Sequence, residues 1–171
     1  MTDTIVNPCY DNDPLDGYTE IALPSEQYLK AFWDVDILTS QQKPASKIIR
    51  SDEAFTVRFR VVLIGELWCC ISGDWCFNLG FSSIGKGTDF DLSDLVGKDK
   101  FWVKGWQGCG GRCVELLVPV PAGTIPTDYC GSLYECGGWF ELHCCDRGPV
   151  VVVGMEALEE QFFFRENTPA C

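Results

Sequence analysis

FTVRFRVVL, residues 55–63, decides the fold class of this 171-residue chain. Apolar side chains occupy every second position, at Phe55, Val57, Phe59, Val61 and Leu63. A period of two places successive side chains on opposite faces of an extended chain, so the stretch predicts a strand with one buried face. Arg58 and Arg60 are then expected on the solvated face.

Similar short patterns fill the rest of the chain. Residues 75–81 alternate again after a turn at residues 72–74, which predicts a hairpin with the first strand. Further strands are predicted at residues 114–120, 139–145 and 150–153, and residues 159–166 are expected to extend the last one. Glycine and proline turns separate these strands, without the long helices that parallel sheets require. We therefore expect an all-β, antiparallel, two-sheet β-sandwich of seven to nine strands with an immunoglobulin-like architecture.

The N-terminal part differs in composition from the rest. Residues 1–30 are acidic and are interrupted by Pro8, Pro14, Gly17 and Pro24, which predicts an irregular arm or cap. Residues 31–171 are expected to form a single β-sandwich domain, because this length supports one hydrophobic core.

Charge and hydropathy limit the partners and the compartment. A formal net charge of −12 disfavours nucleic acid and anionic lipid, whose phosphates require Lys and Arg for neutralisation. The longest apolar run, residues 61–71, contains Gly65 and Glu66, so we expect no membrane insertion. The first residues are acidic instead of basic and apolar, so a cytoplasmic location is expected, with non-Sec export or an extracellular assembly left open.

Eleven cysteines are the most unusual feature of the composition. Three pairs flank short turns and are candidate disulfides: Cys70 with Cys76, Cys109 with Cys113, and Cys130 with Cys136. Because the count is odd, at least one cysteine must stay unpaired, bind a ligand or bond to another chain, and Cys9 and Cys171 are the preferred candidates.

Metal binding is the alternative use of these residues. The chain contains no CxxC motif, but Cys109, Cys113, His143 and Cys145 form a conceivable zinc site. Two acidic loops offer oxygen ligands for calcium, although neither follows the EF-hand register; their ligands are Asp11, Asp13 and Asp16, and Asp89, Asp91, Ser93 and Asp94. Solvated turns are the ordinary interpretation of such clusters, so no cofactor is expected.

Aromatic residues supply the candidate interface. Trp102, Trp106 and Trp139 fall near strand ends and glycine-rich loops, where they are placed to line a peptide or carbohydrate platform. Phe162, Phe163 and Phe164 are consecutive, so in a strand at least one of them must point away from the core.

These patterns favour a non-catalytic module that acts by protein binding or self-assembly, with strand addition at residues 150–164 as its mechanism. The competing hypothesis is a cysteine-based zinc or thiol-redox protein. A hydrolase is a third possibility, and it would have to use His143, the one histidine of the chain.

Overall fold

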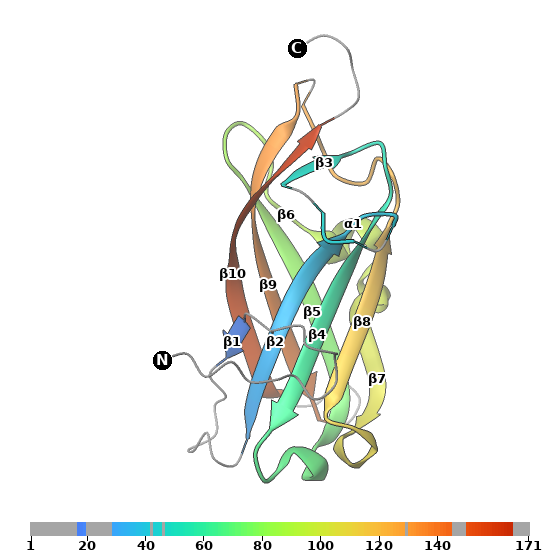
Figure 1. Ribbon diagram of the computed structural model, residues 1–171, viewed down its shortest axis with the longest axis vertical. Helices are drawn as coiled ribbons and strands as arrows, with labels where there is room; N and C mark the ends of the chain where they lie inside the picture. Colours follow the sequence, from blue (N-terminus) through green and yellow to red (C-terminus); the bar gives the residue numbers. More distant parts are fainter. Residues whose placement is uncertain are drawn as a thin grey trace.

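The chain folds into two β-sheets that pack face to face (Figure 1). The computed structural model describes residues 17–19, 29–41, 43–45, 47–128, 130–144 and 150–165. The smaller sheet contains, in spatial order, β1 (Gly17–Thr19), β2 (Lys30–Leu38), β4 (Phe55–Ile64) and β8 (Cys113–Val120). β1 comes from the predicted arm and pairs with β2.

The larger sheet is built around β5 and β9. Its spatial order is β3 (Ile48–Arg50), β10 (Val150–Arg165), β9 (Ser132–His143), β5 (Ser72–Ser83) and β6 (Phe90–Asp91), and β7 (Trp102–Gln107) also pairs with β5. The helical elements are short: α1 (Leu92–Val96) and the 3-10 turns η1 (Trp68–Cys70), η2 (Lys98–Phe101) and η3 (Gly108–Gly110). The prediction of an all-β, two-sheet sandwich is confirmed. The described residues contain ten strands instead of seven to nine, because β1, β3 and β6 are too short to show a period.

The core lies between the sheets and is rich in aromatic rings. Phe59 of β4 and Phe77 of β5 approach across the interface, with ring centroids 5.2 Å apart. Trp33 of β2 meets Phe140 of β9 edge to face at 5.2 Å, and both side chains are fully buried. Such rings bury a large apolar area, which is the main favourable contribution to folding.

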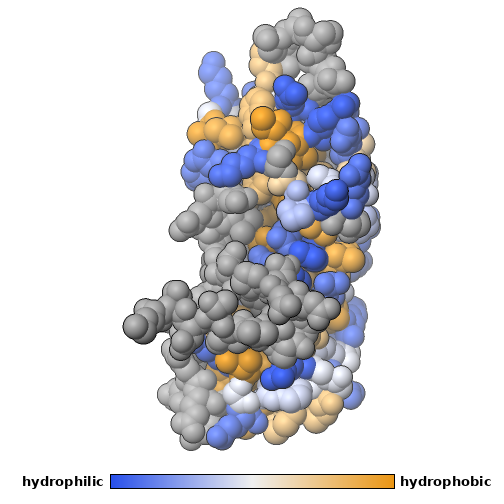
Figure 2. Space-filling view, in the orientation of Figure 1, coloured by the Kyte–Doolittle hydropathy of each residue, from blue (hydrophilic) through white to orange (hydrophobic). Residues whose placement is uncertain are grey.

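Cross-strand ion pairs lie on the outer face of the smaller sheet. Arg58 pairs with Asp36 at 2.6 Å, and Arg60 pairs with Asp34. Both arginines are on the outer face as predicted, but Arg60 is only 2% exposed instead of solvated. Its burial is tolerated because carboxylates of β2 compensate its charge. Figure 2 shows hydrophilic and hydrophobic residues interspersed over the visible part of this face.

The predicted hairpin between residues 55–63 and 75–81 is wrong. Residues 72–74 belong to β5, where Ser72 lies opposite Gln107 and Asp74 lies opposite His143. The chain instead reverses at residues 65–71, through Gly65 with a φ of 107° and the turn η1, and crosses from one sheet to the other. The crossing lets β4 and β5 bury their apolar faces against each other, which neighbours within one sheet cannot do.

None of the helices in the described ranges is long and apolar enough to span a membrane.

Close packing of the sheets predicts a sharp effect at Gly138. A Cβ atom at this position would lie 2.8 Å from the Trp33 ring, so Gly138→Ala should lower the free energy of unfolding by about 1–3 kcal/mol through overpacking. Urea denaturation measures the effect. Gly110→Ala is the matched control, since no atom lies within 4 Å of its Cβ position. Equal stability of the two variants would contradict this packing.

Candidate functional site

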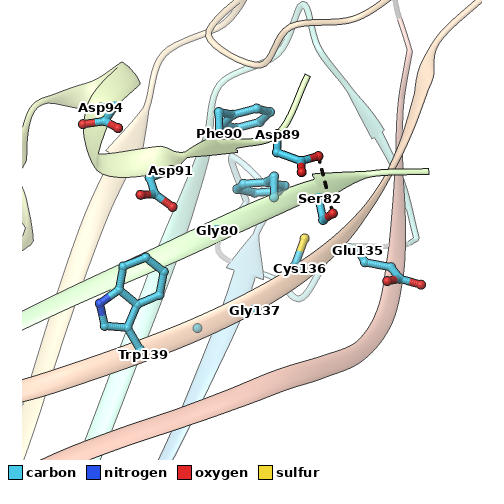
Figure 3. Close-up of a pocket in the computed structure, with 12 residues that line it drawn as sticks. Gly80, Ser82, Asp89, Phe90, Asp91, Asp94, Glu135, Cys136, Gly137 and Trp139 are labelled. Carbon is cyan, nitrogen blue, oxygen red and sulfur yellow. Dashed lines mark hydrogen bonds between the residues drawn. The ribbon is translucent and has the colours of Figure 1, made fainter. Parts of the chain in front are cut away.

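A groove of about 780 Å³ lies on the outer face of the larger sheet (Figure 3). Its floor is made by Gly80 of β5 and Gly137 of β9, which are direct cross-strand partners. Their neighbours Leu79, Phe81, Cys136 and Gly138 are buried, so the alternation turns both glycines outward. Because these two cross-strand partners both lack a side chain, nothing covers the sheet backbone at this point, and a groove results.

Trp139 and Asp91 form the walls next to this floor. A Cβ atom on Gly80 would lie 3.3 Å from Asp91 Oδ1 and 3.5 Å from the Trp139 ring, so the two side chains converge above Gly80. Figure 3 shows them on either side of that residue. Trp139 stands on β9, whereas Asp91 is held over the sheet by β6.

Two contacts fix the segment that carries Asp91. The Phe90 ring stacks on Phe81 of β5 with centroids 4.9 Å apart and an interplanar angle of 15°. At the start of α1, the Ser93 backbone N–H donates to Asn78 Oδ1 at 3.3 Å. Both anchors are on β5, so the position of Asp91 over the groove is determined by the sheet itself.

The groove concentrates negative charge, because four carboxylates line it. Asp89 accepts a hydrogen bond from the Ser83 backbone N–H at 2.7 Å, Asp94 pairs with Lys98 at 2.9 Å, and Glu135 accepts from Gln161 at 3.3 Å. Within the described part of the chain, the Asp91 carboxylate makes no hydrogen bond or ion pair, although the Asp91 backbone pairs with Gly80 of β5. Its two oxygens therefore keep their full acceptor capacity for a ligand.

The three predicted disulfides are not formed. Cys70, Cys76, Cys109 and Cys136 carry thiols, whereas Cys113 and Cys130 are disulfide-bonded. The prediction for the first pair depended on the hairpin that is absent, since Cys70 ends η1 while Cys76 lies inside β5. Cys136 points into the core from β9, away from the loop that carries Cys130. The sulfur of Cys109 instead donates to the carbonyl oxygen of Cys69 at 2.6 Å.

Of the proposed zinc ligands, the structure describes Cys109, Cys113 and His143, and it does not bring these three together as a metal site. Cys113 cannot provide a thiolate while it is disulfide-bonded, and His143 Nε2 lies 2.8 Å from Glu141 Oε2. Cys145 is outside the described residues, as are Asp11, Asp13 and Asp16 of the first acidic loop. Of the second loop, Asp89, Asp91 and Asp94 line the groove. Across the residues that the structure describes, no group of three or more His, Cys, Asp or Glu side chains is placed to hold a metal ion.

The aromatic interface candidates have different environments. Phe162 and Phe164 are buried core residues, so they are unavailable to a partner, whereas Phe163 points outward and is partly buried. Trp106 packs edge to face on Trp75 at 5.4 Å, and Trp102 lies 5.3 Å from the His143 ring. Among the tryptophans that the sequence singled out, Trp139 is the one that lines the groove.

Sequence reasoning missed the glycine floor and the position of Asp91 above it. A glycine inside a strand pattern signals a close backbone approach or a ligand, and Gly80 and Gly137 both fit that description. The pairing of one with the other depends on strand register, which no local pattern contains.

Burial of the Cys136 thiol raises its pKa from 9.0 to about 12. In the unfolded chain the thiol ionises at its ordinary pKa, so stability that is complete below pH 9 is lost as the pH rises toward 12. The free energy of unfolding should therefore fall over this range, and less steeply in Cys136→Ala than in the parent protein. Chemical denaturation at several pH values measures the slope. An unchanged slope in Cys136→Ala would contradict the burial of an ionisable thiol.

Comparison with known proteins supports the fold alone. No protein-family model matches the chain, and no curated protein matches its sequence. A crystal structure of the C-terminal domain of wzt superposes with a TM-score of 0.52 and 7% sequence identity, covering 90% of this chain and 80% of that one. At this identity the likeness indicates a shared β-sandwich arrangement and carries no information about function.

Proposed function

We propose that this protein is a non-catalytic binding module, built on an immunoglobulin-like sandwich, that recognises a basic side chain of a protein partner in the groove. The convergence of Asp91 and Trp139 above the Gly80–Gly137 floor is the observation that carries the proposal. An ammonium or guanidinium group seated on the floor would meet an indole ring on one side and a carboxylate on the other.

The chemistry of the groove favours a cation over other ligands. A Lys or Arg cation within about 6 Å of an indole centroid gains about 0.5–2 kcal/mol from the ring quadrupole. Asp91 adds a charge-assisted hydrogen bond, and Asp89, Asp94 and Glu135 add a favourable field. The same carboxylates, with the net charge of −12, repel phosphates. A basic segment of a protein supplies the required group.

Cysteine-based catalysis is disfavoured at the groove, because the one cysteine among its lining residues is buried against the core. Cys136 is the cysteine at this site, and its pKa of about 12 keeps the thiol protonated near neutral pH. Thiolates are the reactive form of cysteine, so this residue contributes packing and no nucleophile. The carboxylates then act as hydrogen-bond acceptors for a bound cation.

A pair of peptides tests the proposal directly. The first contains one arginine among glycines and serines, and the second contains citrulline, the neutral isostere, at the same place. Titration followed by intrinsic tryptophan fluorescence and calorimetry should show tighter binding of the arginine peptide, and added salt should weaken it. Asp91→Asn and Gly80→Val should each lower its affinity by about tenfold or more, since one removes the charge and the other fills the floor.

The control is Glu66→Gln, which changes net charge by the same amount at an exposed residue outside the groove. It should bind the arginine peptide as the parent protein does. Equal affinity for the two peptides, or an effect of Glu66→Gln as large as that of Asp91→Asn, would show that the groove does not select a cation.

Self-association is the second candidate function, and the edge of β10 favours it. On the side away from β9, β3 is the strand of the larger sheet that pairs with β10, and it reaches residues 163–165. Among the described residues, no strand pairs with residues 150–162 on this side, and an unpaired strand edge is a template for strand addition. Removing residues 160–171 would also remove the core residues Phe162 and Phe164, so deletion cannot test the idea.

A substitution that preserves the core is the better test of self-association. Val153→Pro would remove one backbone donor from β10, whereas Val153→Thr keeps it as a matched control. Light scattering of the parent protein should show association that the proline variant alone loses, with folding of both variants verified by circular dichroism. A monomeric parent protein would overturn strand addition and leave the groove proposal intact.

A further inference from the structure

Three cysteine thiols gather at the contact between two turns, away from the groove. Cys69 and Cys70 lie on η1, and Cys109 lies on η3. The sulfurs of Cys69 and Cys70 are 3.9 Å apart, and the Cys109 thiol donates to the Cys69 carbonyl oxygen at 2.6 Å. Cys70 and Cys109 are exposed, and Cys69 is partly exposed, so all three are open to reagents in solution.

Backbone packing holds the two turns together. The Gly108 N–H donates to the Ile71 carbonyl oxygen at 2.8 Å, and Gly108 is buried. A Cβ atom at this position would lie 2.0 Å from the Trp68 carbonyl oxygen, so only glycine permits so close an approach. Because Cys109 directly follows Gly108, its side chain lies beside Cys69. The packing of the two turns therefore determines the positions of the three thiols.

The protonation of these thiols is linked. The pKa of Cys70 is raised because its thiol is hydrogen-bonded to Cys69 and because negative charge on Cys69 or Cys109 opposes its ionisation. A negative charge on one sulfur of the cluster therefore favours the protonated form of the Cys70 thiol beside it. Exchange with a disulfide requires one attacking thiolate and a second thiol within reach to release the mixed disulfide.

We propose that Cys69, Cys70 and Cys109 form a thiol–disulfide exchange site that accepts an exposed disulfide of another molecule, R–S–S–R. The Cys109 thiolate attacks one sulfur of that disulfide, which forms a new S–S bond and releases one RS⁻ that takes up a proton. A thiolate of the Cys69–Cys70 pair then attacks the Cys109 sulfur, closes an internal disulfide and releases the second RSH.

The two exchange steps are balanced in electrons. Two protein thiols are oxidised to one internal disulfide, and the incoming disulfide is reduced to two thiols. The third thiol of the cluster stays reduced and supplies a nucleophile that can reopen the internal bond. The site is independent of the groove, so either can fail without the other. The proposal also assigns three specific residues to the thiol-redox hypothesis that the cysteine content suggested.

Oxidised glutathione is the probe for this site, at about pH 8 where exposed thiols are partly ionised. Intact mass should show a transient adduct of one glutathione per chain, followed by its loss and a net loss of two hydrogens. Peptide mapping should place the new disulfide within the three-cysteine cluster. In the C69S/C70S variant the mixed disulfide on Cys109 has no resolving thiol, so its lifetime should lengthen by about tenfold or more.

Cys76→Ser is the matched control, because Cys76 carries a thiol outside the cluster on β5. It should release glutathione as fast as the parent protein, and circular dichroism checks the folding of every variant. Stable glutathione adducts on the parent protein, no reaction at the cluster, or equal adduct lifetimes in C69S/C70S and Cys76→Ser would overturn the proposal.

Discussion

The antiparallel ladder between β5 and β9 is the constraint on which the rest of the structure depends. It runs from Asp74 opposite His143 to Ser83 opposite Tyr134. Because side chains alternate along a strand, this one register sends Phe77 and Phe140 into the core and turns Gly80 and Gly137 outward as partners. A slip of one residue would exchange the two faces of a strand, and both the core and the groove would be lost together.

The two outer faces use acidic residues in different ways. On the smaller sheet, Asp34 and Asp36 are neutralised by Arg58 and Arg60, so the charges there serve stability and cross-strand pairing. On the larger sheet, Asp91 is left without such a partner among the described residues, next to an indole ring and over a bare floor. This difference in neutralisation supports the proposal that the outer face of the larger sheet binds a cation.

At two positions the absence of a side chain on glycine allows another group to approach the backbone closely. Gly138 admits the Trp33 ring between the sheets, and Gly108 admits the Trp68 carbonyl group between two turns. In the first case the result is a closely packed core, and in the second it is a cluster of three thiols. Several of the described cysteines therefore differ in environment: Cys136 is a buried thiol, Cys113 and Cys130 are disulfide-bonded, and the thiols on η1 and η3 are exposed or partly exposed.

The sequence by itself determined the fold class, because the period-two alternation of residues 55–63 and 75–81 is local and survives any tertiary arrangement. It also indicated that one of the three consecutive phenylalanines must turn outward, and that residue is Phe163. It named Trp139 among several aromatic candidates without separating it from them.

Only the tertiary structure decided which strands are neighbours, and the predicted hairpin and the three disulfides failed for that reason. The pairing of Gly80 with Gly137 and the approach of Cys109 to Cys69 join residues distant in the chain. Such contacts follow from register and from the burial of whole faces, which are properties of the assembled sheets and not of any local stretch of sequence.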